Sequence, residues 1–152
     1  MTLLRLAITM LALTMSLGTP VVAQTLAEMV VVTSIVGTLD SSIRLPSGSF
    51  QVTNPKYATE FADLLGADKP KYTSYTLYVA TGIATKLATA YVGDLMTGFA
   101  VSGYFEISKS ETKVGADVRT RIEFNNADTN KNLLLLVVRR ADRVYFLVAA
   151  KK

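Results

Sequence analysis

Segments in which apolar and polar residues alternate, or in which β-branched residues run together, predict a chain built mainly of β-strands. The first is the run over 29–36, which ends at Gly37. The segments 43–45 and 50–52 flank a Pro-Ser-Gly-Ser cluster and predict a hairpin. Residues 71–80 alternate next. One side of this predicted strand carries Tyr75, Leu77 and Val79, and the other carries Tyr72, Ser74, Thr76 and Tyr78.

A short helix is predicted between the hairpin and the strand over 71–80. Asn54 is a suitable N-cap, Pro55 suits the first helical position, and Gly66 suits the left-handed residue after the helix. Four apolar side chains fall on one face between these caps: Tyr57, Phe61, Leu64 and Leu65. The pattern therefore predicts a helix with one buried side.

The segment 83–96 fits two patterns. Ile83, Leu87, Tyr91 and Leu95 have helical spacing, and the alanines favour a helix. Turn-forming pairs, Thr81-Gly82 and Gly93-Asp94, flank the segment and favour a strand. We predict a strand here and keep a second helix over 83–96 as the alternative.

The last third of the chain predicts four further strands. The first covers 99–107 and is followed by a polar turn over 108–113, and the second alternates over 114–124. A loop of eight residues (125–132) leads to six consecutive apolar residues, 133–138, which predict a central strand buried on both faces. The chain returns over 144–150. Four residues of the second strand are predicted to face solvent: Asp117, Arg119, Arg121 and Glu123.

Long strands with one or two helices predict an α+β fold. We expect a mainly antiparallel, meandering sheet that is covered on one face by the short helix over 57–65. Residues 24–152 have the length of one domain, and no segment is rich enough in proline or serine to be a linker.

Residues 1–23 have the pattern of a secretory signal peptide. Arg5 precedes an apolar stretch over 6–17, and Val21 and Ala23 place small residues before a cleavage position. A second acceptable cleavage position follows Ala27. The apolar run is shorter than the roughly 20 residues that a membrane-spanning helix needs, so no transmembrane segment is predicted in the mature chain.

The composition narrows the compartment and the chemistry. The chain has no cysteine, so it has neither disulfides nor a cysteine for lipid attachment. A cysteine-free exported domain of this size is more typical of a bacterial periplasm or medium than of a eukaryotic secreted protein. Histidine is also absent, which removes the common zinc ligands and the commonest general base. The net charge of +4 is too small to predict a nucleic-acid partner.

Two short motifs resemble chemical sites only in part. Ser110 and Lys113 have the spacing of serine–lysine acyl-transfer enzymes, but they fall in a predicted polar turn without partner motifs. The segment 128–132 begins like a calcium loop, yet Leu133 replaces the required glycine and Arg139 replaces the required glutamate. We predict no catalytic residue, no metal site and no cofactor.

Two groups of residues are candidates for ligand binding. Tyr72 and Tyr78 are predicted on one polar side of a strand, where an exposed row of rings would stack on a peptide or a glycan. Arg139, Arg140 and Arg143 surround a turn and would attract anionic lipid or polysaccharide. The structural alternative is that these charges protect a turn and an edge strand from aggregation.

These observations predict an exported, non-enzymatic binding or accessory protein of the cell envelope, whose partner is an envelope protein or a small ligand. One alternative is a peripheral binder of anionic lipid or polysaccharide that uses the basic hairpin. The other is a cofactor-free enzyme that uses carboxylates, for which Glu106 and Glu123 are the candidate pair.

Overall fold

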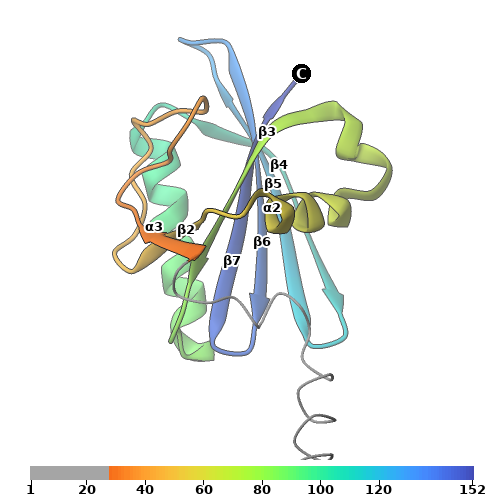
Figure 1. The fold of residues 1–152 in the computed structure, drawn as a ribbon. Coiled ribbons are helices and arrows are strands. Elements are labelled where there is room, and N and C mark those ends of the chain that lie inside the picture. The colour runs from red at the N-terminus through yellow and green to blue at the C-terminus, as the bar shows by residue number, and fades with distance from the viewer. Residues whose placement is uncertain (1–27) are drawn as a thin grey trace, which may run out of the picture.

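The computed structural model describes residues 28–152 and contains one seven-stranded sheet with helices packed beside it (Figure 1). The elements are, in chain order, β1 (Met29–Val31), β2 (Ser49–Val52), α2 (Pro55–Ala62), the 3-10 helix η2 (Asp63–Lys71), β3 (Tyr72–Ala80), α3 (Thr85–Val101), β4 (Phe105–Val114), β5 (Asp117–Asn126), β6 (Lys131–Arg140) and β7 (Arg143–Lys151). The predicted leader and its two cleavage positions lie outside the described residues. Between residues 28 and 152, no helix is long and apolar enough to cross a bilayer.

The strands are arranged in the order β1-β2-β3-β7-β6-β5-β4, and every neighbouring pair is antiparallel. The predicted α+β class and antiparallel sheet are therefore confirmed. Strands β4 to β7 form a meander, while β3 joins this meander through β7. Strands β1 and β4 form the two edges of the sheet.

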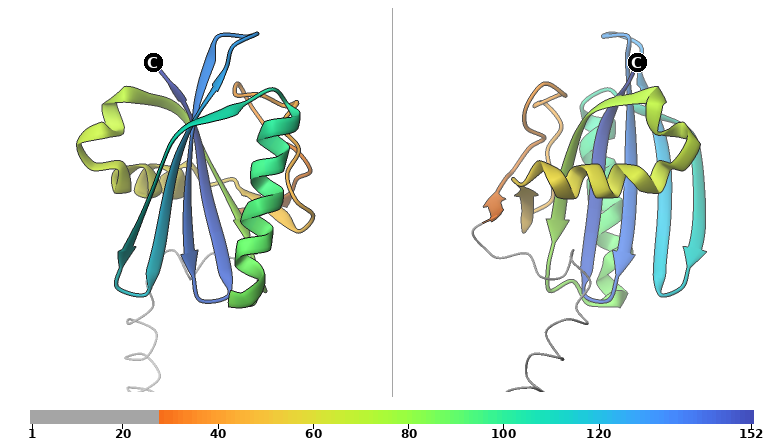
Figure 2. Two further views of the ribbon diagram at one scale, coloured as in Figure 1. Left: turned by 180° about the vertical axis from the view of Figure 1, so that it is seen from behind. Right: turned by 45° about the vertical axis from the view of Figure 1, so that its right-hand side comes forward.

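Helices lie on opposite sides of the sheet (Figure 2). We call the side with α3 the α3 face; its strands contribute Ile122, Phe124, Leu133, Leu135, Val137, Val144, Phe146 and Val148 to one buried cluster. We call the side with α2 and η2 the α2 face; its strands contribute Leu77, Val79, Leu134, Leu136, Val138, Tyr145, Leu147 and Ala149 to a second cluster. All six residues 133–138 are buried, which confirms the predicted central strand.

The predicted first strand and hairpin differ from the structure. Strand β1 ends at Val31 instead of Val36, and β2 pairs with β1 and β3 instead of with 43–45. The apolar residues between β1 and β2 pack on the α3 face, and Ile35 and Ile43 are fully buried there. Burial against a helix, which local turn signals do not report, determines the path of this segment.

The short predicted helix is present, and its N-terminal end is as expected. The Asn54 side chain accepts a hydrogen bond from the Lys56 amide at 3.1 Å, and Pro55 occupies the first turn. The α-helix ends at Ala62, before Gly66, and the chain continues as η2. Gly66 has φ +55°, so the left-handed φ expected for it occurs within η2.

Residues 85–96 are helical, so the predicted strand is wrong and the alternative of a second helix is right from Thr85 onward. Helix α3 extends to Val101 and buries Ala88, Tyr91, Leu95 and Phe99. Gly93 and Asp94, which suggested a turn, lie on its exposed side and break no buried contact. The predicted strand over 99–107 is therefore also wrong in its first half.

The polar residues 108–113 form part of strand β4 instead of a turn. Every residue of β4 is exposed, because β4 lies at the edge of the sheet and neither helix covers it (Figure 2). When both faces of a strand are exposed to solvent, neither face has to be apolar. The sequence of such a strand therefore lacks the alternation that identifies half-buried strands. The turn between β4 and β5 follows Val114 and contains Gly115, which has φ +60°.

Candidate functional site

The three predicted arginines lie together at one end of the sheet. A pocket of about 390 Å³ lies between the β6–β7 turn, the β4–β5 turn and the first turn of α3. Its lining residues are Thr85, Ala88, Ala116, Val118, Arg139, Arg140, Ala141 and Arg143. We call it the arginine pocket. The structure therefore brings the predicted arginines to one concave surface.

A backbone hydrogen bond holds the start of α3 against the β6–β7 turn. The amide of Ile83 donates a hydrogen bond to the carbonyl oxygen of Asp142 at 2.8 Å. Helix α3 has Ala84 at its N-cap, with no side-chain cap and no acidic residue in its first turn. The partial positive charge of a helix N-terminus is thus not offset by its own first turn.

Two of the three arginines are held by carboxylates. Arg140 donates from Nε and Nη2 to the two carboxylate oxygens of Asp117, at 2.7 and 2.6 Å. This fork-to-fork contact lowers the pKa of the Asp117 carboxyl and raises the pKa of Arg140. Arg139 donates from Nη2 to Glu111 at 3.0 Å. These pairs reduce the charge of the pocket and restrict the positions of both guanidinium groups.

Arg143 differs from its two neighbours. Its Nη1 donates to the Tyr145 hydroxyl at 3.3 Å, and no carboxylate of residues 28–152 lies within 4 Å of its guanidinium. Arg143 is therefore the arginine of the pocket lining whose charge no nearby carboxylate of the described chain offsets, and its contact with Tyr145 places its guanidinium on the α2 face. The sequence identified the three arginines, but it did not reveal that Asp117 and Glu111 would pair with two of them.

The predicted exposed tyrosine row is wrong. Tyr72 is 2 % exposed and Tyr78 is fully buried. They also belong to opposite faces, because the pairing of β3 with β7 shifts register between Thr73 and Thr76, and Ser74 there has φ +57°. A bulge adds one residue and reverses the alternation that follows it. The two rings thus cannot form a stacking surface.

The buried tyrosines instead connect parts of the fold. The Tyr78 hydroxyl accepts a hydrogen bond from the Val36 amide at 3.0 Å, and burial raises the pKa of Tyr78 to about 12. Tyr104 donates to Asp40 at 2.7 Å. Both contacts attach the segment between β1 and β2 to the α3 face. Their role is internal packing with satisfied hydroxyl groups.

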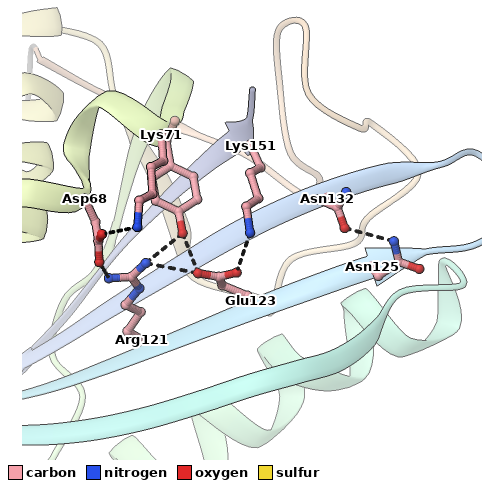
Figure 3. A network of polar contacts seen from close by, with 8 residues as sticks. Asp68, Lys71, Arg121, Glu123, Asn125, Asn132 and Lys151 are labelled. Atoms are coloured by element: carbon pink, nitrogen blue, oxygen red, sulfur yellow. Dashed lines mark hydrogen bonds and ion pairs between the residues drawn. The ribbon is translucent and has the colours of Figure 1, made fainter.

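Charged side chains form a network on the α2 face that the sequence pattern does not predict (Figure 3). Arg121 donates to Asp68 at 2.6 Å, to the Tyr72 hydroxyl at 2.7 Å and to Glu123 at 3.0 Å. Lys151 reaches Glu123 at 3.1 Å. Residues predicted to face open solvent are thus partly covered by η2. Because its members satisfy one another, this network has the character of a structural contact between η2 and the sheet.

A second basic pocket, of about 340 Å³, lies at the opposite end of the sheet. Its lining residues are Thr38, Leu39, Asn130, Lys131, Asn132, Leu133, Ala150, Lys151 and Lys152. We call it the lysine pocket. Lys151 is paired with Glu123, whereas no carboxylate of the described chain lies within 4 Å of Lys131 or Lys152.

The other motifs take positions that do not support catalysis or calcium binding. Ser110 and Lys113 lie on opposite faces of β4, since they pair with Arg121 and Val118 of β5. The loop after β5 is an asparagine turn in which Asn126 Oδ1 accepts from the amides of Asp128 and Thr129, both at 3.1 Å.

The candidate carboxylate pair is also separated. Glu106 pairs with Phe124 and lies on the α3 face, whereas Glu123 is the neighbour of Phe124 and lies on the α2 face. The sheet therefore stands between the two carboxylates. This arrangement removes the pair on which the enzyme alternative depended.

Comparison of the chain with protein-family models, with curated proteins and with solved structures finds no match.

Proposed function

We propose that the protein is an exported, non-enzymatic binding protein of the bacterial cell envelope that binds an anionic ligand at the arginine pocket. The observation that carries this proposal is the position of Arg143. Arg143 lines the arginine pocket without a carboxylate partner in the described chain, and its contact with Tyr145 places its guanidinium on the α2 face, while the uncapped N-terminus of α3 lies on the α3 face. The proposed compartment rests on the signal-peptide pattern and the absence of cysteine.

The ligand class follows from the lining of the pocket. Guanidinium groups and helix N-terminal amides both favour phosphate or carboxylate. The Asp117 and Glu111 pairs hold Arg140 and Arg139 in fixed positions, so less side-chain entropy would be lost on binding. Half of the lining residues are apolar, namely Ala88, Ala116, Val118 and Ala141. An anionic group attached to an apolar body, as in an anionic phospholipid, fits this combination.

The test is binding to lipid vesicles. Purified protein should associate with vesicles that contain phosphatidylglycerol more strongly than with pure phosphatidylcholine vesicles, and added salt should weaken the association. Arg143→Ser should weaken it about fivefold, because one basic residue near an anionic surface contributes about 1 kcal/mol. A competition experiment with inorganic phosphate distinguishes the two kinds of site. Phosphate should displace the protein from vesicles if the site binds any phosphate, and it should not if the site requires a lipid headgroup.

Two matched variants serve as controls. Arg44→Ser removes an arginine from an exposed position near Gly98, which is about 20 Å along α3 from Thr85. Lys131→Ser removes a charge from the lysine pocket. Both should bind like the wild type. If Lys131→Ser weakens binding and Arg143→Ser does not, the anionic site lies at the lysine pocket and the proposal is wrong.

A further inference from the structure

Strand β4 presents a long, uncovered edge to the surroundings. All ten residues from Phe105 to Val114 are exposed, and β5 is the neighbour on one side only (Figure 2). Three apolar side chains are among them, with exposed fractions of 51 % for Phe105, 50 % for Ile107 and 45 % for Val114. An edge of this length offers unpaired amides and carbonyl groups to another strand.

The two faces of β4 follow from its pairing with β5. Lys109, Glu111 and Lys113 pair with residues of the α3 face, and Ser108, Ser110 and Thr112 pair with residues of the α2 face. The register shifts between Glu106 and Ser108, so Ile107 is an extra residue. This shift places Glu106 on the same face as Lys109, because Glu106 pairs with Phe124.

We propose that β4 pairs antiparallel with β4 of a second copy of this chain, around a two-fold axis at Ser110. Residues opposite each other in such a pair must lie on the same face. Ile107 is the bulge residue and has no partner; every other residue of β4 then lies opposite a residue on the same face of the sheet. The pairs are Ser110 with Ser110, Lys109 with Glu111, Ser108 with Thr112, Glu106 with Lys113, and Phe105 with Val114.

Charge complementarity carries the proposal. In this register, each of the four charged residues of β4 opposes a residue of opposite sign, and each pair occurs twice by symmetry. A two-fold axis one residue later, at Glu111, would oppose Lys109 to Lys113 and Glu111 to itself. The alternating signs thus select one register and disfavour its neighbour.

The same charges argue against a purely protective edge. A strand edge that is protected against pairing carries lysines that repel a second copy. Here the lysines are matched by Glu106 and Glu111, and Glu111 remains 54 % exposed although it accepts a bond from Arg139. Phe105 and Val114, at the two ends, would cover each other and reduce exposed apolar surface.

The second copy must use the same strand. The opposite edge, β1, is only three residues long, so it cannot match ten residues of β4. Pairing of β4 with β4 also closes the assembly at two copies, whereas pairing of β4 with β1 would continue indefinitely. The proposed partner is therefore one further copy in an isologous dimer, which joins the two sheets through their β4 edges.

The first test uses the absence of cysteine from the chain. Ser110→Cys places one thiol on the two-fold axis, where the paired Cα atoms would lie about 4.5–5.5 Å apart and suit a disulfide. Thr112→Cys, on the same face of the same strand, is the matched control, because its two copies would lie about 13 Å apart. Under mild oxidation, Ser110→Cys should form a covalent dimer and Thr112→Cys should not. Equal cross-linking of both variants, or none with Ser110→Cys, overturns the proposal.

The second test exchanges charges at two positions that form no ion pair within residues 28–152. Neither Glu106 nor Lys113 makes an ion pair within residues 28–152, so their exchange should leave the monomer folded. Lys113→Glu should weaken the dimer about tenfold in sedimentation equilibrium, because it opposes like charges twice. The double variant Glu106→Lys/Lys113→Glu should restore it. A wild-type chain that is monomeric at all concentrations up to about 100 µM, or a double variant as weak as the single one, contradicts the proposed pairing.

Discussion

Asp68 shows how single residues in this protein join elements that are distant in sequence. Its carboxylate accepts from Lys71 at 2.6 Å and from Arg121 of β5 at 2.6 Å (Figure 3). The hydrogen bond from Lys71 and that from Arg121 lower the pKa of the Asp68 carboxyl from 3.8 to about 2. The ionised form is therefore stabilised by folding.

The stability of the protein should consequently depend on Asp68 in a defined range of pH. Because the folded pKa lies below the unfolded value of 3.8, the contribution is complete above about pH 5 and is lost as the pH falls toward 2. Asp68→Asn should be less stable than the wild type at pH 7, and most of this difference should be lost by about pH 2. Urea unfolding of both proteins at several pH values measures this. A difference that stays constant throughout would contradict the assigned ion pairs.

Tyrosines illustrate what a sequence does not reveal at the residue scale. Alternation placed Tyr72 and Tyr78 on one side, and regular strand geometry would have required this. The bulge near Ser74 moves the residues after it to the opposite face of the sheet. Serine is not among the residue types that commonly adopt a left-handed φ, so the sequence does not indicate this bulge. Likewise, Arg121 and Glu123 followed a solvent-facing pattern, but η2 lies over them. Both errors come from tertiary contacts that local periodicity does not contain.

Helix α3 passes close to the backbone of Arg44 at Gly98. A Cβ atom added at Gly98 would lie 2.1 Å from the carbonyl oxygen of Arg44, whereas a Cβ atom at Gly93 would meet open space. The two glycines belong to the same helix. They therefore separate the effect of helix propensity from the effect of close packing.

Alanine substitutions at these two positions should act in opposite directions. Gly93→Ala should stabilise the protein by about 0.5–1 kcal/mol, because alanine is the better helix former. Gly98→Ala should destabilise it by more than about 1 kcal/mol, because the collision with backbone outweighs the same gain. Chemical denaturation gives both values. Equal stabilisation by the two variants would show that the segment around Arg44 does not contact α3 at Gly98.

Elements with a strong local signal were predictable, and elements determined by their neighbours were not. The caps Asn54 and Pro55, the alternation of β5 and the apolar run in β6 all identified their elements. Residues 108–113 of strand β4 were mistaken for a turn because, at the edge of the sheet, they are polar on both faces. Helix α3 was mistaken for a strand because Gly93 and Asp94 are tolerated on an exposed helix face.

The whole molecule combines one sheet with charged residues at both of its ends. Sequence alone nominated the three arginines, since clustered charge around a turn is visible without a structure. It could not supply the rest of the pocket, because the first turn of α3 and Ala116 come from distant parts of the chain. The compensation of Arg140 by Asp117 depends on strand register in the same way.

The proposed export of the protein predicts where its mature N-terminus lies. Protein recovered from the periplasm or medium of a bacterial host should begin at Gln24, or at Glu28 when cleavage follows Ala27. Ala23→Arg should abolish the first cleavage and leave Glu28 as the start, because a large charged residue does not suit the position before the cut. N-terminal sequencing measures this. Recovery of chains that begin at Met1, in the cytosolic fraction, would contradict export.

The place of β7 in the sheet has a consequence for biosynthesis. This strand follows all the others along the chain, yet it lies between β3 and β6 and connects the two halves of the sheet. Until it emerges from the ribosome, the early and late strands have no common neighbour, and the nascent polypeptide cannot reach its native state. The last strand to be synthesised is thus the one that joins β1–β3 to the β4–β6 meander.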